Sequence, residues 1–195
     1  MASPERFTAE HAGLLVVDLQ GKLLERIDGR DAMLANVLLI VRAAGLLGVP
    51  VVATEQYPAG LGPTFPAVAD LVPDRFAKTT FHAAATPGVL AFLDARRVRQ
   101  VTLVGIEAHV CVAQTALELL ANGYKVQVLA DASSSRHAVD REVAFRRLEA
   151  AGAVVSTAEA ALFEWAGTAD RPEFKALSAL VKEADLARLA PRPPA

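Results

Sequence analysis

Residues 13–18 read Gly-Leu-Leu-Val-Val-Asp (GLLVVD), a short apolar run that ends in an acid. The run is too short for a helix, and an unbroken apolar pattern of this length is typical of a strand buried on both faces. Such strands belong to parallel sheets that carry helices on both sides. The stretch therefore predicts the first strand of a parallel sheet, with Asp18 at its carboxyl end.

Strands and helices alternate along the rest of the chain. Apolar runs predict strands at residues 50–54, 100–105, 124–130 and 153–156, and RFAKTTF (75–81) is a short β-prone stretch. Apolar residues at helical spacing predict helices at residues 31–47, 86–97, 111–122, 139–151, 159–165 and 172–188. This alternation predicts an α/β fold in which two helical layers enclose a parallel sheet.

Length and punctuation indicate how the chain is divided. A chain of 195 residues without an internal repeat or a linker predicts one domain over residues 1–190, and the tail 191–195 (PRPPA) is expected to be disordered. Residues 55–73 hold four prolines and two glycines, so we expect mainly a long loop there. Long loops inside compact domains often carry function.

Charge and hydropathy exclude several classes of partner. The 20 basic and 22 acidic residues give a net charge of −2, so no large basic field exists for a nucleic acid or an anionic membrane. The most membrane-like stretch, residues 33–53, has Arg42 near its centre and is better explained by a helix and a strand of a soluble domain. A polar N-terminus and a single cysteine predict a cytoplasmic protein.

Three residues have the chemistry and the position of a reactive site. Asp18 and Cys111 both follow predicted strands, and open parallel sheets bind ligands at the carboxyl ends of their strands. Cys111 also begins a predicted helix, whose N-terminus should lower the pKa of the thiol, although a lone cysteine is more often a small buried apolar residue. Lys78 would supply positive charge that keeps the thiolate and the carboxylate ionised.

An ordered series of motifs resembles one known family. The segments that carry the resemblance are LLVVDLQ (14–20), TEQYPAGLGPT (54–64), FAKTTF (76–81), GIEAHVCVAQTALELLANGY (105–124), DASSSR (131–136), DREVAFRRLEAAGA (140–153) and PEFKALSALVKEAD (172–185). Together they resemble the isochorismatase-like cysteine hydrolases, and most of all the branch of isochorismatase-domain-containing proteins. This superfamily includes isochorismatases, nicotinamidases and N-carbamoyl amidohydrolases.

The resemblance implies a fold and a mechanism. The fold would be a three-layer α/β/α sandwich with a six-stranded parallel, Rossmann-like sheet. Asp18, Lys78 and Cys111 would form a catalytic triad in which the thiol attacks a carbonyl carbon, the acid moves protons and the lysine holds the other two in place. A cis peptide bond would join Ile106 to Glu107, and the backbone amides of Glu107 and Cys111 would form the oxyanion hole.

The chain departs from its metal-dependent relatives. Tyr57 stands where nicotinamidases resembling this chain have their first histidine ligand, and no histidine follows before His82. His82, His109 and His137 have no metal-ligand spacing, and no GxGxxG motif follows the first strand. We therefore expect no zinc and no other cofactor.

The expected function is hydrolysis of a small amide, ureide or related carbonyl compound without a cofactor, since a cysteine nucleophile favours acyl chemistry. Four alternatives remain: a non-catalytic member that acts by binding or assembly, a vinyl-ether hydrolase of the isochorismate type, a nucleotide-binding sheet protein, which the missing glycine motif disfavours, and a serine nucleophile at 133–135 served by His137 and Asp131. The candidates for substrate binding are Gln20, Tyr57, Leu61, Phe81 and His109.

Apolar residues beyond one helical stripe predict self-association. Leu39 and Ile40 lie off the main apolar face of the first helix. The last helix adds Phe174, Leu177, Leu180, Val181 and Leu186. We expect a homo-oligomer, a dimer or larger, although packing of the late helix across the sheet would absorb part of this surface.

Overall fold

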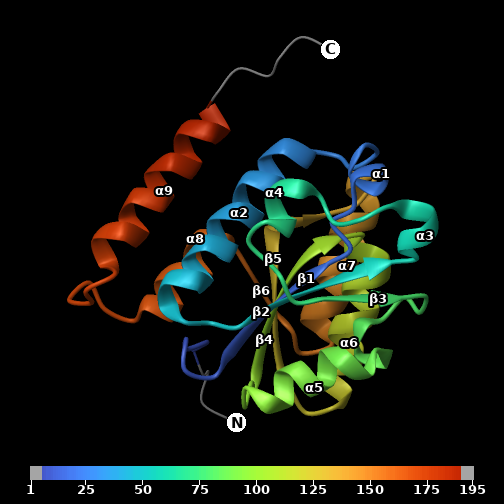
Figure 1. Ribbon diagram of the computed structural model, residues 1–195, viewed down its shortest axis with the longest axis horizontal. Coiled ribbons are helices and arrows are strands. Elements are labelled where there is room, and N and C mark those ends of the chain that lie inside the picture. Colours follow the sequence, from blue (N-terminus) through green and yellow to red (C-terminus); the bar gives the residue numbers. More distant parts are fainter. Residues whose placement is uncertain (1–5, 190–195) are drawn as a thin grey trace.

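The computed structural model describes residues 6–189, and its centre is one six-stranded sheet (Figure 1). The strand order is β3-β2-β1-β4-β5-β6, and every neighbouring pair is parallel. The predicted sheet is confirmed, and the β-prone stretch at 75–81 supplies one of its two edge strands. The strands are β1 (Ala12–Val17), β2 (Val51–Gln56), β3 (Arg75–Lys78), β4 (Gln100–Ile106), β5 (Lys125–Ser134) and β6 (Val154–Ser156).

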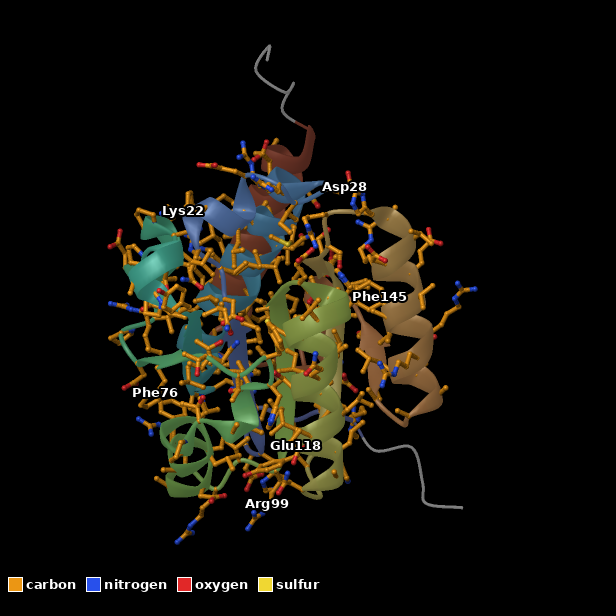
Figure 2. All side chains as sticks on the ribbon, turned by 90° about the vertical axis from the view of Figure 1, so that its right-hand side faces the viewer. Lys22, Asp28, Phe76, Arg99, Glu118 and Phe145 are labelled. Carbon is orange, nitrogen blue, oxygen red and sulfur yellow. The ribbon has the colours of Figure 1, made fainter. Side chains whose placement is uncertain are left out.

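Two helical layers cover the sheet, as the sandwich requires. One layer holds α2 (Arg30–Leu47), α8 (Ala158–Ala166) and α9 (Phe174–Leu189), and the other holds α5 (Pro87–Ala95), α6 (Ala113–Ala121) and α7 (Ala138–Ala150) (Figure 1). Figure 2 looks onto the second layer, where α6 and α7 lie side by side with Phe145 between them.

Side chains of one strand serve both layers, because successive residues of a strand point to opposite faces. Leu14 and Val16 of β1 belong to the core under α2, whereas Leu15 and Val17 belong to the core under α6. All of them are fully buried, which explains the unbroken apolar run in the sequence.

The segment expected to be a long loop contains short helices. The strand β2 continues to Gln56, and α3 (Pro58–Leu61) and α4 (Pro66–Ala69) follow it. Both helices begin with a proline, whose fixed φ suits the first helical turn. Two of the four prolines that suggested a loop therefore begin helical turns. The short helices α1 (Gly21–Leu24) and η1 (Ala83–Ala85) were also not predicted.

Most of the apolar surplus assigned to self-association is buried inside this chain. Leu39 and Ile40 lie in the core, because α2 packs against α8 and α9 as well as the sheet. Leu177 and Leu180 of α9 are buried as well, and Leu186 alone among the named leucines is exposed. The packing of the late helix thus explains what the sequence suggested a second copy would cover.

Gly105 allows β4 to approach β1 next to the site. Its φ is +122°, and a Cβ there would collide with the backbone oxygen of Val17. Only glycine can occupy this position of β4, which lies opposite Val17, the last residue of β1 before Asp18. The predicted tail at 191–195 lies outside the described residues. Within residues 6–189, no helix has the length and apolarity needed to cross a bilayer.

Candidate active site

Asp18 leaves the end of β1 in a left-handed conformation, with φ of 52°, and its side chain is fully buried. Each carboxylate oxygen has a partner. The Thr54 hydroxyl donates to Oδ1 at 2.7 Å, and Lys78 Nζ donates to Oδ2 at 2.6 Å. A buried carboxylate needs such partners, because its desolvation without them would cost on the order of several kcal/mol.

Lys78 ends the edge strand β3, and its side chain is 1% exposed. Besides Asp18, its ammonium group donates to Gln56 Oε1 at 2.6 Å and lies 3.2 Å and 3.3 Å from the carbonyl oxygens of Thr80 and Phe81. The segment after β3 therefore wraps around the ammonium group. The ion pair is fixed in one geometry.

Cys111 lies within a π-helical turn, η2 (Ala108–Val112), which joins β4 to α6. The helix expected at 111–122 thus begins earlier, with Glu107 as the residue before its first turn. In an α-helix the Cys111 amide would donate to the Glu107 carbonyl. Here the amides of Val110 (3.0 Å) and Val112 (3.2 Å) donate to that oxygen instead, so the Cys111 amide is left out of this hydrogen-bond pattern.

Cys111 is 7% exposed, and its thiol interacts with both charged residues of the predicted triad. Burial, above all, and then the negative charge of Asp18 raise the pKa of Cys111 to about 12, although Lys78 acts in the opposite direction. The lowered pKa expected from the helix N-terminus is therefore wrong. The structure places a carboxylate and a dry environment beside the sulfur, and both favour the neutral thiol.

The peptide bond between Ile106 and Glu107 is cis, as the resemblance implied. The N–H of Glu107 donates no hydrogen bond to any residue in the described range 6–189. This amide and the Cys111 turn follow the same strand end. Of the two residues expected to supply the oxyanion hole, Glu107 precedes the π-turn and Cys111 lies within it.

The candidates for substrate binding occupy different environments. Gln20 is fully buried, and its amide bonds to the backbone of Gln56 (2.7 and 3.0 Å) and of Gly62 (2.6 Å), so it fastens the segment that contains α3. Tyr57 and Phe81 are 56% and 54% exposed, and Leu61 is half-buried.

His109 is half-buried on the thiol turn, and its Nδ1 lies 2.9 Å from the Ser135 hydroxyl. The serine alternative is not assembled, because the carboxylate of Asp131 accepts from the Ala158 amide at 2.8 Å and His137 is exposed. In the described part of the chain, no three histidine, cysteine or acidic side chains are grouped so that they could hold a metal ion.

Two hollows lie at opposite ends of the strands. A pocket of about 370 Å³ opens beside Lys78, lined by residues 57–59, 77–80 and 85–87. A larger one, of about 730 Å³, is lined by residues that include Glu10, Pro50 and Arg96, at the amino ends of the strands. Open parallel sheets bind ligands at the carboxyl ends of their strands, where the smaller pocket lies, and Lys78 is the member of the predicted triad that lines it.

The sequence analysis missed Thr54 and Gln56, which hold Asp18 and Lys78. Both are polar and lie at the carboxyl end of β2, the strand beside β1. The available signal was a polar residue that ends an otherwise apolar strand.

Comparison with known proteins places the chain in a family. A family model described as the isochorismatase domain matches residues 12–160. Isochorismatase domain-containing protein 2 from Bos taurus is 43% identical over 173 residues, which cover 87% of this chain and 82% of that protein.

Solved structures agree. The MAR1 ribonuclease from Caenorhabditis elegans has 36% identity and a TM-score of 0.87, over 98% of this chain and 100% of that one. YcaC from Pseudomonas aeruginosa, solved with hexane-2,5-diol and covalent acrylamide, has 26% identity and a TM-score of 0.87, over 96% and 98%. The YcaC gene product from Escherichia coli, described as an octameric hydrolase of unknown specificity, has 25% identity and a TM-score of 0.90, over 96% and 95%. The protein with this buried acid, lysine and thiol at one sheet edge belongs to the isochorismatase family.

Proposed function

We propose that this protein is a cysteine hydrolase that cleaves a small amide, ureide or related carbonyl compound, with Cys111 as the nucleophile. The observation that carries the proposal is the buried ion pair of 2.6 Å between Lys78 and Asp18, both of which influence the pKa of Cys111, the single cysteine of the sequence. Buried ion pairs seldom exist for stability alone, because desolvation offsets most of their attraction.

Asp18 is the general base in this mechanism. The thiol, with its pKa raised to about 12, is protonated at neutral pH, so attack on a carbonyl requires a base in contact with the sulfur. Asp18 takes the thiol proton while sulfur bonds to the carbonyl carbon. The tetrahedral intermediate then expels the amine, to which Asp18 returns that proton, and a thioester remains on Cys111.

Water completes the reaction. Asp18 takes a proton from a water molecule, whose oxygen attacks the thioester carbon. The second tetrahedral intermediate expels the sulfur, which recovers the proton, and the acid product leaves. Lys78 keeps Asp18 oriented through both steps, since it is held by four oxygen acceptors. The backbone amides of Glu107 and Cys111 stabilise the oxyanion.

The relatives support this chemistry at the level of their descriptions. The Escherichia coli relative is described as a hydrolase, and the Pseudomonas aeruginosa relative was solved with covalent acrylamide. Acrylamide is an electrophile that soft nucleophiles such as thiolates attack. A reactive nucleophile on the same fold favours covalent catalysis here.

A screen of small amides, ureides and carbamoyl compounds, with ammonia or amine release as the signal, tests the proposal. Cys111→Ala should abolish turnover of any hit and leave the fold intact, because the substitution removes a single sulfur atom from the site. Labelling of Cys111 by iodoacetamide should be faster than that of free cysteine and saturable. A Cys111→Ala variant that turns over its substrate at the wild-type rate would refute the covalent mechanism. Slow, unsaturable labelling together with an empty screen would favour a role in binding alone.

Ribonuclease activity is a second candidate, because the Caenorhabditis elegans relative carries that description at 36% identity. The net charge of −2 disfavours it, since phosphodiester substrates are usually held by a basic field. Incubation with a labelled single-stranded RNA decides between the two. Cleavage that Cys111→Ala abolishes would replace the amide by RNA as the substrate.

We also propose that the reaction needs no metal or other cofactor. Tyr57 replaces a histidine ligand of metal-dependent relatives, so EDTA should change neither turnover nor the melting temperature. Stoichiometric zinc in the purified protein, with activity lost on its removal, would contradict this expectation.

We further propose that the protein is a cytoplasmic homo-oligomer that binds no nucleic acid and no membrane. The octameric description of the Escherichia coli relative supports self-association. Light scattering at micromolar concentration measures it. A mass near that of one chain, 20.6 kDa, would refute the proposal.

A further inference from the structure

The segment that follows β5 holds the thiol turn at two points. Glu107 Oε2 accepts two hydrogen bonds from Arg136, one from its backbone N–H at 3.1 Å and one from Nε at 3.0 Å. One residue earlier, the Ser135 hydroxyl lies 2.9 Å from His109 Nδ1. Two consecutive residues therefore bind the thiol turn: Arg136 binds Glu107, which precedes the π-turn, and Ser135 binds His109, which lies inside it.

This segment is itself anchored and can serve as a fixed support. The Ser134 hydroxyl donates to the carbonyl oxygen of Asp28 at 2.8 Å, and the amide of Asp28 donates to the carbonyl oxygen of Ser135 at 3.1 Å. Ser134 and Ser135 are buried. In Figure 2, Asp28 lies at the end of the sheet opposite Arg99, which precedes β4, and so at the carboxyl edge with the thiol.

Glu107 is held both through its backbone and through its side chain. Its N-terminal neighbour Ile106 belongs to β4, and its own carboxylate, 16% exposed, is tied to Arg136. The N–H between these two restraints donates to none of residues 6–189. Fixing the side chain and the strand end together fixes the direction of this N–H.

We propose that Glu107 is a positioning residue whose carboxylate, clamped and neutralised by Arg136, aims the Glu107 backbone N–H at the oxygen of the tetrahedral intermediate. The inference rests on the proposed cysteine mechanism and deepens it. The guanidinium has a second purpose, because a free carboxylate on this residue would repel the developing oxyanion. Both effects act when negative charge forms on the substrate oxygen, and neither acts on the sulfur directly.

Two small electrophiles distinguish an effect on the oxyanion from an effect on the reactivity of the sulfur. With acetaldehyde, sulfur bonds to the carbonyl carbon, the thiol proton passes to Asp18 and the carbonyl oxygen becomes an alkoxide, so the hemithioacetal places an oxyanion in the hole. With iodoacetamide, sulfur bonds to the methylene carbon, iodide leaves and the thiol proton passes to the base, so no oxyanion forms. Acetaldehyde affinity is measured by its protection of Cys111 from iodoacetamide, with mass spectrometry as the readout.

The proposal predicts an order among variants of the full-length protein. Glu107→Ala should weaken acetaldehyde binding by about 10-fold or more, less than the 10²–10³-fold typical of losing a whole oxyanion donor. Arg136→Gln should weaken it less, because the backbone N–H of Arg136 still donates to the carboxylate. Glu107→Gln should stay near wild type, since its amide oxygen accepts both bonds and carries no charge. Iodoacetamide labelling should be unchanged in all three.

The matched control is Arg42→Gln, which removes an ion pair of 2.6 Å between α2 and α9. It should leave both reactions at wild-type values. Wild-type acetaldehyde affinity in Glu107→Ala would overturn the proposal, as would an equal loss of labelling, which indicates a general disturbance of the turn. If Glu107→Ala does not fold, the exposed Arg136 carries the same test through Arg136→Gln against Arg136→Lys, which should recover part of the affinity. A wild-type thiol that reacts no faster than free cysteine would instead overturn the mechanism itself.

Discussion

Two ion pairs in this protein share a nitrogen–oxygen distance of 2.6 Å but differ in their surroundings. Lys78 and Asp18 are 1% and 0% exposed at the carboxyl edge of the sheet, whereas Arg42 and Glu183 are 42% and 62% exposed between α2 and α9. The exposed pair is solvated in both the folded and the unfolded state, so its contribution to the free energy of folding is small. The buried pair was taken out of water at a high cost, and its presence beside a thiol points to chemistry. Equal distances therefore say little about the importance of a pair until burial is known.

Removal of the cation from the buried pair should have the largest effect. Lys78→Met keeps the apolar stem but leaves Asp18 as an unpaired buried charge, so the free energy of unfolding should fall by about 3–5 kcal/mol. Turnover should fall by about 10²–10⁴-fold, the usual contribution of a well-placed general base. Urea unfolding and turnover measure the two effects. An unchanged urea midpoint would mean that water or protonation compensates Asp18, and the contrast between the two pairs would fail.

Neutralising the acid should have a smaller effect on stability and a more informative effect on the thiol. In Asp18→Asn the amide oxygen still accepts from the Thr54 hydroxyl. Because the charge of Asp18 raises the pKa of Cys111, the pKa should fall in this variant, and more thiolate should be present. Turnover should nevertheless fall, because the base is gone.

The pH dependence of iodoacetamide labelling checks this prediction. Wild-type labelling should vary little between about pH 6 and 9, because the thiol pKa of about 12 lies above that range and Asp18 removes the proton. Asp18→Asn labelling should rise as the pH increases. Faster turnover in Asp18→Asn would contradict the role of the acid and favour a preformed thiolate.

The raised thiol pKa should also appear in the alkaline stability. Above the unfolded value near 9.0 the unfolded chain loses the thiol proton, whereas the folded chain keeps it until about pH 12, so the unfolded state binds fewer protons. Stability should therefore fall as the pH rises from about 9 to 12. Cys111→Ala lacks this contribution, and its melting temperature should decline less over that range. Parallel declines in the two proteins would contradict the raised pKa.

The exposed pair should give the smallest effect. Arg42→Gln should cause no measurable change in melting temperature or turnover, because both side chains are solvated. The hydrogen bond from Arg42 lowers the pKa of Glu183, so the variant should return this pKa to the ordinary range. NMR titration of the Glu183 carboxyl measures the shift. A loss of stability like that of Lys78→Met would remove the distinction between the pairs.

The sheet could be predicted from the sequence because strands that are buried on both faces appear as unbroken apolar runs. The first strand was expected at 13–18 and lies at Ala12–Val17, and the fourth was expected at 100–105 and lies at Gln100–Ile106. The π-turn left no such record. The residues Ala108–Val112 are mostly apolar and fit a helix of either period, so only the hydrogen bonds of the folded chain distinguish the two.

The strand-end positions of the candidate residues could be predicted from the sequence, but the electrostatics around them could not. Asp18 and Cys111 were each expected at a strand end, but their separation in sequence hides that the charge of Asp18 raises the pKa of the thiol. The helix N-terminus is a local signal and favours the thiolate, whereas the dominant influences, burial and Asp18, come from the assembled fold. The grip of Arg136 on Glu107 joins β5 to the thiol turn and was invisible for the same reason.

The close approach at Gly105 determines how far this protein can be altered by directed evolution. A side chain there would meet the backbone of Val17, and the φ of +122° is one that other residues rarely adopt. Any replacement would push β1 and β4 apart at the point where one delivers the acid and the other the thiol turn. A library that randomises residue 105 under selection for folded protein should return glycine, whereas the exposed Tyr57 and Phe81 offer positions at which new specificities can be sought.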